Sequence, residues 1–386
     1  MSKIVFFCIP AHGHTNPTLK VVEALCRRGH EVTYYSFEPF RAPIEAAGAR
    51  FVGCDGYDVK GIQADGAEVA RDIVAAAKLI ASTTLSMEEQ VTRELTALKP
   101  DVIVADSVAY WGKLFAQKLG IPLVISNTTF AFNRHSAKVM KQGFGDLVKT
   151  LVKMPRASRA LKPLRERGYA AKGFLDVISV DDATPTVVYT SRLFQPSADT
   201  FSDKFTFVGP CLRDSAAPWP KGSRPLIYVS MGTVIGGEGD FFRRCVEAFR
   251  DGSRDVVMSV GEGAEIGALP ENIRAYPRVD QLSVLQSADV FITHCGMNSA
   301  SEALCYGVPL LMRPLTQEEG GVANRVSELG AGIMLEDTSP KAIREAADAL
   351  LNDDARRAAA GKIADSFHRC GGAEAAADAI LAAIHA

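Results

Sequence analysis

The chain has 386 residues, of which 47% are hydrophobic and 23% are charged, and its formal net charge is −2. This length suggests two to three domains, and the composition is that of a globular protein with enough apolar residues for well-packed cores. The small net charge gives no global field that would recruit nucleic acid. Because no run of about 18 consecutive apolar residues occurs, no membrane span is expected.

The first apolar run, residues 4–9, stops at Pro10 and has no small-residue cleavage site after it. We therefore interpret it as a buried first strand and not as a signal peptide. Eight cysteines are scattered along the chain, without a Cys-x-x-Cys pair or a zinc-ligand spacing. Reduced thiols in a cytoplasmic protein are the simplest account.

Short apolar runs alternate with helical patterns, which predicts βα units and parallel sheets. The first helix is expected at 17–28, closed by Gly29. A Pro- and Gly-rich stretch without periodicity separates two series of strands. The strands are expected at 3–9, 31–36, 50–54, 102–105 and 122–126, and then at 226–230, 255–260, 290–293, 309–312 and 333–335.

The pattern thus predicts an α/β protein with two doubly wound, Rossmann-like domains. Ligands in such sheets bind beyond the carboxyl ends of the strands, and two such edges could face a central cleft. The expected boundaries are 1–208 for the first domain, 209–225 for a linker, 226–365 for the second domain, and 366–386 for a terminal helix that packs back on the first domain.

The strongest motif begins where the apolar strand at 290–293 runs into His294 and Gly296. Asn298 and Ser299 then suit a helix start, whose free backbone N–H groups and dipole favour a phosphate. Glu302, one turn later, could accept hydrogen bonds from ribose hydroxyls. The alternative is a plain strand–turn–helix corner capped by Asn298.

A second motif, residues 10–17, follows the first strand. Asn16 and Pro17 read as a helix cap and a first helical residue, so His14 would stand just before the helix and be kept neutral by its dipole. Asp106, at the end of the strand near 102–105, could hydrogen-bond that imidazole and fix its tautomer; the alternative is a cap for a helix starting near Ser107. His12 is interpreted as a loop residue that shapes the turn.

These motifs resemble the family-1, or UDP-glycosyltransferase, superfamily and, within it, the bacterial macrolide-type members. Their donor signature His-x-Gly-x-Asn-Ser-x-x-Glu matches His294, Gly296, Asn298, Ser299 and Glu302 residue by residue. The resemblance spans nearly the whole chain and includes residues 13–17, 190–199, 207–210, 228–233 and 323–330. It implies the GT-B fold, with an N-terminal acceptor domain and a C-terminal nucleotide-sugar donor domain.

The resemblance also implies a reaction. An inverting transferase would move a sugar, with glucose as the expected one, from a UDP-sugar to a hydroxyl of a small hydrophobic acceptor such as a flavonoid, phenol, polyketide or macrolide. His14 would be the base, oriented by Asp106, and no cofactor or metal is expected, since the sequence has no Asp-x-Asp pair. The protein would be a monomer or weak dimer. The donor-binding residues would be Gly232, Thr233, Arg278, Val279, Gln281, His294, Gly296, Met297, Asn298, Ser299, Glu302, Glu318 and Glu319.

Two departures from the family pattern affect the donor. Arg278 stands where a tryptophan commonly stacks on the base, although a guanidinium can also stack on a planar ring. Glu319 replaces the glutamine that usually follows the acidic residue matched by Glu318, and a carboxylate only accepts hydrogen bonds. On the acceptor side, the aromatic candidates are Tyr57, Phe130, Phe132 and Phe144.

Residues 138–172 hold ten Lys or Arg and only two acids, interleaved with apolar residues. We interpret this stretch as a mobile, solvated helical flap over the acceptor pocket; the alternative is a surface that lies on anionic lipid. Other functions stay open on the same fold, namely N-acetylglucosaminyl transfer to a lipid acceptor or sugar-nucleotide epimerisation. A nicotinamide dehydrogenase is disfavoured because the first βα turn lacks Gly-x-Gly-x-x-Gly, and a solute-binding protein because no signal peptide is expected.

Overall fold

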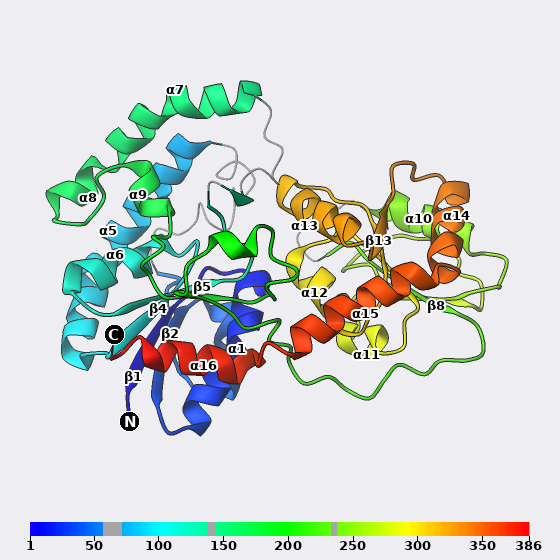
Figure 1. Cartoon of the computed structure of the whole chain (residues 1–386), viewed down its shortest axis with the longest axis horizontal. Helices are drawn as coiled ribbons and strands as arrows, with labels where there is room; N and C mark the ends of the chain where they lie inside the picture. Colours follow the sequence, from blue (N-terminus) through cyan, green and yellow to red (C-terminus); the bar gives the residue numbers. More distant parts are fainter. Residues whose placement is uncertain (57–71, 134, 137–143, 233–237, 386) are drawn as a thin grey trace. The chain divides into compact units, whose positions relative to one another are not determined.

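The computed structural model describes residues 1–56, 72–133, 135–136, 144–232 and 238–385, with the backbone alone for 144–151. The chain divides into two compact units (Figure 1). The first unit comprises Met1–Thr190, Ser197–Arg213 and Cys370–Ala386, and the second comprises Ser191–Pro196 and Asp214–Arg369. Each unit is an α/β domain built on one parallel sheet, as the alternation of apolar runs and helical patterns predicts.

The first unit contains a seven-stranded parallel sheet in the order β3-β2-β1-β4-β5-β6-β7. Its first five strands fall within two residues of their predicted bounds at either end, whereas β6 and β7 were not predicted. Both have only three residues, too few for a readable pattern. The strands are β1 Lys3–Phe7, β2 Glu31–Ser36, β3 Arg50–Gly53, β4 Val102–Asp106, β5 Leu123–Asn127, β6 Thr186–Val188 and β7 Phe205–Phe207.

Successive side chains of these strands enter two different cores, since strand residues alternate between the faces of a sheet. Val5 and Phe7 pack beneath α5, α6, α7, α8 and α9, whereas Ile4 and Phe6 pack with α1, α2 and α16 on the other face. The helices are α1 His12–Arg27, α2 Arg41–Ala46, α5 Ile73–Leu98, α6 Tyr110–Leu119, α7 Phe144–Ala160, α8 Lys162–Glu166, α9 Phe174–Ile178 and α16 Gly372–Ala382.

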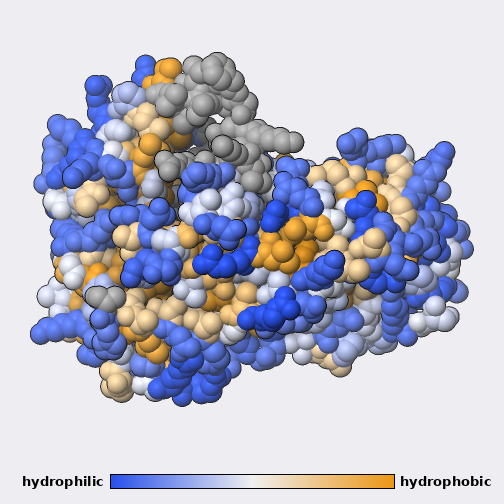
Figure 2. All heavy atoms as spheres, in the orientation of Figure 1, coloured by the Kyte–Doolittle hydropathy of each residue, from blue (hydrophilic) through white to orange (hydrophobic). Residues whose placement is uncertain are grey.

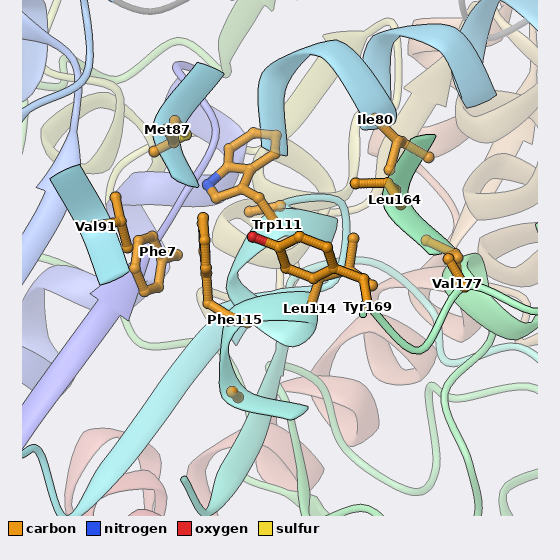
Figure 3. Packing of buried hydrophobic residues seen from close by; sticks show 14 of the residues in the cluster. Phe7, Ile80, Met87, Val91, Trp111, Leu114, Phe115, Leu164, Tyr169 and Val177 are labelled. Carbon is orange, nitrogen blue, oxygen red and sulfur yellow. The ribbon is translucent and has the colours of Figure 1, made fainter. Parts of the chain in front are cut away.

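Figure 3 shows the first of these cores, where Trp111, Phe115 and Tyr169 lie among aliphatic side chains of α5 and α8. This packing corrects the interpretation of residues 138–172 as a solvated flap. Ala157, Leu161 and Leu164 are fully buried. Around these three residues the apolar side is therefore the inner face of a packed helical layer and the basic residues form its outer face, whereas Val152, further back, is 70% exposed.

The second unit contains a six-stranded parallel sheet in the order β10-β9-β8-β11-β12-β13. Five strands match the prediction within one residue, while β10 was missed because its sequence, Ile-Arg-Ala-Tyr, is neither apolar nor strictly alternating. The strands are β8 Leu226–Ser230, β9 Asp255–Ser259, β10 Ile273–Tyr276, β11 Val290–Thr293, β12 Leu310–Met312 and β13 Gly332–Met334. The helices are α10 Gly239–Ala248, α11 Gln281–Leu285, α12 Met297–Cys305, α13 Gln317–Glu328, α14 Pro340–Leu351 and α15 Asp354–His368.

The Pro-rich segment after Arg213 is held against the second unit by hydrogen bonds. The Trp219 N–H donates to the Ser283 carbonyl at 2.9 Å, and the Trp219 ring packs edge-on against Tyr276. The end of the chain forms two helices, of which α16 lies along α1 in the first unit (Figure 1). There Arg27 and Arg28 pair with Glu374 of α16, and Ile380 is buried in the core shared with α1.

Hydrophilic side chains cover most of the face shown in Figure 2. Among the helices that the structure describes, none combines the length and the apolarity needed to cross a membrane.

Candidate active site

The helix that carries His14 starts earlier than predicted. α1 begins at His12, and the N–H groups of His14 and Thr15 donate to the Ala11 carbonyl at 3.0 and 2.9 Å. Asn16 and Pro17 therefore lie inside the helix, and their interpretation as cap and first residue is wrong. Both residue types favour helix starts, which misplaced the boundary by one turn. His14 consequently sits within the first turn, at the positive end of the helix dipole.

The imidazole of His14 is held by a buried carboxylate. Its Nδ1 lies 2.7 Å from Asp106 Oδ2, and the Asp106 side chain is only 1% exposed. Asp106 Oδ1 accepts from the Val108 N–H at 2.9 Å. Helix α6 begins later, at Tyr110 with Ala109 before it, so Asp106 closes the preceding turn and does not cap that helix.

This contact determines which ring nitrogen is basic. An ionised carboxylate only accepts hydrogen bonds, so the proton of the neutral ring resides on Nδ1 and the lone pair on Nε2. The His14 side chain is 18% exposed. Nearby Tyr110 is a weaker base candidate, because burial and, second, the Asp106 charge raise its pKa to about 12. A histidine held in this way by a carboxylate has the geometry that general-base catalysis requires.

A further contact was not predicted from the sequence. Thr128, which follows β5 directly, is buried, and its Oγ1 lies 3.1 Å from His14 Nδ1. The sequence offered one signal for this contact. Thr128 is a polar residue directly after β5, and β5 is the neighbour of β4, which ends at Asp106.

In the second unit, the turn after β11 folds around the ring of His294. Cys295 has a left-handed backbone with φ of 67°, and α12 begins at Met297 with Gly296 before it. A Cβ on Gly296 would lie 2.6 Å from His294 Nε2, and one on Gly232 would lie 2.8 Å from the same atom. Burial lowers the pKa of His294, so its ring is neutral at pH 7 and one nitrogen keeps a proton to donate.

Replacing Gly296 with alanine is expected to weaken the donor side of the reaction. The new methyl group must displace the His294 ring, and a misplacement of about 1 Å can cost on the order of 100-fold in rate. We expect kcat/KM for the sugar donor to fall roughly 10- to 100-fold. Gly361→Ala, in α15, is the matched control because nothing lies within 4 Å of its added Cβ. Equal donor kinetics in the two variants would contradict this role of the glycine.

Beyond the turn, polar groups of α12 are connected by hydrogen bonds to side chains of α11 and β8. Gln281 Nε2 donates to Glu302 Oε2 at 2.6 Å and lies 3.4 Å from Ser299 Oγ. The Tyr228 hydroxyl donates to Gln281 Oε1 at 3.1 Å, which fixes the orientation of the amide. The structure thus brings Gln281 of α11 together with Ser299 and Glu302 of α12. Met297 is buried, while Asn298 is partly buried.

The two adjacent glutamates at the start of α13 differ in their environments. Glu319 forms a capping box with Thr316, because its Oε2 accepts from the N–H groups of Leu315 and Thr316 at 2.7 and 2.9 Å. Glu318 is exposed. One carboxylate oxygen of Glu319 is therefore committed to its own helix, which the comparison of residue types alone did not reveal.

Glu319→Ala is expected to destabilise the protein, whereas Glu319→Gln is not. Glutamine can keep the capping box, since its carbonyl oxygen accepts the same backbone N–H groups. Loss of a cap costs about 1 kcal/mol, which lowers Tm by about 2–4 °C in a domain of about 150–250 residues. Thermal unfolding of both variants measures this. A glutamine variant as unstable as the alanine variant would count against the cap.

The remaining predicted residues are more scattered or lie outside the described part of the chain. Arg278 is exposed and Val279 is half-buried, on the segment between β10 and α11. Phe130 is buried, while Phe132 is 48% exposed. Thr233 and Tyr57 fall outside the described residues, as does the side chain of Phe144. Among the described residues, no group of three or more His, Cys, Asp or Glu side chains could hold a metal ion.

The chain is similar to several known proteins. Residues 247–377 match the family described as Erythromycin biosynthesis protein CIII-like, C-terminal domain. The NDP-glycosyltransferase YjiC of Bacillus subtilis (strain 168) is 35% identical over 97% of this chain and 95% of its own. Demethyllactenocin mycarosyltransferase of Streptomyces fradiae is 32% identical over 98% of this chain and 86% of its own.

Among solved structures, that of CalG4, the calicheamicin glycosyltransferase, superposes with a TM-score of 0.84 and 29% identity, over 100% of this chain and 98% of that one. The two parallel-sheet domains of this chain are those of the GT-B fold. Its sequence similarity to the two transferases named above extends over nearly its full length. The chain therefore belongs to the bacterial macrolide-type branch of the family-1 glycosyltransferases and is a glycosyltransferase of natural-product type acceptors.

Proposed function

We propose that the chain transfers glucose from UDP-glucose, with inversion at the anomeric carbon, to a hydroxyl of a small hydrophobic acceptor such as a flavonoid, phenol, polyketide or macrolide. The observation that carries the proposal is the 2.7 Å contact between His14 Nδ1 and Asp106 Oδ2. This contact leaves Nε2 as an oriented base, which an acceptor hydroxyl requires and a nucleotide-binding module does not.

The reaction is a single displacement. His14 Nε2 takes the proton of the acceptor hydroxyl while the oxygen forms a bond to the anomeric carbon. The bond from that carbon to the diphosphate oxygen breaks on the opposite face, so the configuration inverts. Asp106 stabilises the imidazolium that forms.

The donor would bind at the start of α12. The negative charge that grows on the leaving diphosphate would be stabilised by the His294 ring and by the backbone N–H groups of the helix start. Glu302 would accept from the ribose hydroxyls, with Gln281 and Ser299 beside it. Glu318, exposed at the start of α13, is the carboxylate we assign to the sugar hydroxyls, since Glu319 caps its helix.

The acceptor would meet apolar side chains in the segments that follow β4 and β5. Val108 and Phe132, which follow β4 and β5, are 38% and 48% exposed although they are large and hydrophobic. An apolar acceptor would cover these two side chains. Two similar proteins are named demethyllactenocin mycarosyltransferase and calicheamicin glycosyltransferase, and these names support a natural product as the acceptor.

The test is a mass-spectrometric screen of phenolic and polyketide acceptors against UDP-glucose, UDP-galactose, UDP-N-acetylglucosamine and a thymidine-diphosphate sugar. NMR of the product would give the anomeric configuration. A β-glucoside formed from UDP-glucose, whose sugar is α-linked, supports the proposal. A retained configuration would overturn the single displacement, and a clear preference for a thymidine-diphosphate donor would overturn the UDP assignment.

Activity is expected to survive excess EDTA. In the proposed mechanism, the backbone N–H groups at the start of α12 and the His294 ring stabilise the negative charge of the diphosphate. No divalent cation is therefore needed there. Initial rates should agree within about twofold with and without chelator, a difference too small to reflect the loss of a charge-stabilising group. A large loss that magnesium or manganese restores would contradict this account of leaving-group stabilisation.

A further inference from the structure

We propose that Thr128 is a positioning residue of the catalytic base, which holds His14 Nδ1 together with Asp106 and thereby raises the basicity of Nε2. This inference rests on the proposed function, in which His14 is the general base. The family pattern already suggests the pair of His14 and Asp106, and the inference adds Thr128 as a third member. Thr128 belongs to none of the sequence motifs described above.

The sheet brings the three side chains together. In the register of β4 and β5, Asp106 lies opposite Ser126, and Thr128 follows two residues further along the chain, just past the end of β5. His14 follows β1, which pairs with β4 on its other side. Thr128 is 3% exposed, and its Oγ1 lies 3.1 Å from Nδ1, while Asp106 Oδ2 lies 2.7 Å from it.

The backbone around Thr128 is held by hydrogen bonds on both sides. The Asn127 side-chain amide donates to the Thr129 carbonyl at 2.9 Å. The Asn127 carbonyl accepts from the Tyr189 N–H at 3.3 Å, and the Ser126 carbonyl accepts from the Ser107 N–H at 2.9 Å. These bonds tie the turn after β5 to the neighbouring strands.

The chemistry follows from the single proton on Nδ1. The Asp106 carboxylate is the nearer acceptor, and because Nδ1 carries the proton, the Thr128 oxygen serves as a second acceptor of the same proton. When Nε2 takes the acceptor's proton, the ring becomes positive and its Nδ1–H becomes a stronger donor. Both oxygens then stabilise the charged form more than the neutral one, which raises the basicity of Nε2.

The experiment compares Thr128→Val, which removes the hydroxyl at nearly constant volume, with Thr128→Ser, which keeps it. For an alcohol acceptor, kcat/KM of the valine variant should fall about 3- to 10-fold, the equivalent of one ordinary hydrogen bond. The acid limb of its pH profile should move to lower pH by about half a unit or more, because a weaker base stays unprotonated further into acid. The serine variant should keep the wild-type limb.

A second measurement does not depend on turnover. The ¹⁵N shifts of the His14 ring, assigned by difference with His14→Ala, report the fraction of the Nδ1–H tautomer and the ring's pKa. We expect a lower ring pKa in Thr128→Val than in wild type and in Thr128→Ser. If Thr128→Val lowers kcat but changes neither the acid limb of the pH profile nor the pKa of the His14 ring, the role of Thr128 is merely structural. That result would overturn the inference.

The two proposals fail in different ways. If His14→Ala keeps its activity, the base assignment fails, whatever Thr128 does to the ring. If His14→Ala is inactive but Thr128→Val has the wild-type pH limb and ring pKa, the base assignment stands and the role of Thr128 is overturned.

Discussion

Replacing His14 with alanine is expected to lower turnover on alcohol acceptors by at least about 100-fold, because general-base catalysis typically contributes about 10²–10⁴-fold. The affinity for UDP should stay close to that of the wild type. The residues proposed to bind the donor, Gln281, His294, Ser299 and Glu302, belong to the second unit, whereas His14 belongs to the first. Steady-state kinetics and a UDP titration by tryptophan fluorescence separate the two effects.

Acceptor acidity provides the control for this prediction. A highly acidic phenol ionises with little help, so its loss of rate in His14→Ala should be much smaller than that of an aliphatic alcohol. His12→Ala is the matched variant, since His12 is exposed at the first position of the same helix and its ring packs edge-on against Phe40. Near-wild-type turnover of alcohols in His14→Ala, or an equal loss in His12→Ala, would contradict the assignment.

The close packing around the His294 ring explains why the motif that includes His294 and Gly296 can be recognised in the sequence. The ring folds back over its own turn, and both Gly232 and Gly296 would place a Cβ within 3 Å of Nε2. Only glycine fits at these two points, so the motif reflects a steric requirement. The same local reasoning predicted the strand at 290–293 and the helix start after it, because strand, turn and helix are adjacent in the chain.

Contacts between distant segments could not be predicted in this way. The contact between Asp106 and His14 is the exception, because both lie at the carboxyl ends of strands of one sheet and the family pattern supports the pair. Thr128, by contrast, belongs to no motif and lies 114 residues from His14. The capping box of Glu319 was missed because a glutamate at that position suits a sugar contact as well as a cap with Thr316, three residues earlier. The first helix was misplaced since Asn16 and Pro17 are helix-start residues by propensity, and the backbone bonds to Ala11 override that preference.

Asp106→Asn is expected to reduce turnover by about 10²–10⁴-fold, and to be at least as damaging as Asp106→Ala. An asparagine in place of the orienting aspartate of a histidine base leaves the geometry intact but favours the wrong tautomer. Here the structure indicates why. The two carboxylate oxygens have separate partners, because Oδ1 accepts from the Val108 N–H and Oδ2 faces His14 Nδ1. An asparagine has one acceptor oxygen and one donor NH₂ to fill these two places.

The Val108 N–H can only donate, so the amide oxygen of the introduced asparagine must stay with it and the NH₂ must point at the imidazole. Nδ1 then has to accept, which moves the ring proton to Nε2 and removes the lone pair that the acceptor hydroxyl needs. Alanine, by contrast, leaves both tautomers accessible. Kinetics of the two variants and the ¹⁵N shifts of His14 test this together. An asparagine variant that keeps the Nδ1–H tautomer, or that turns over alcohols faster than the alanine variant, would show that Asp106 acts by its charge alone.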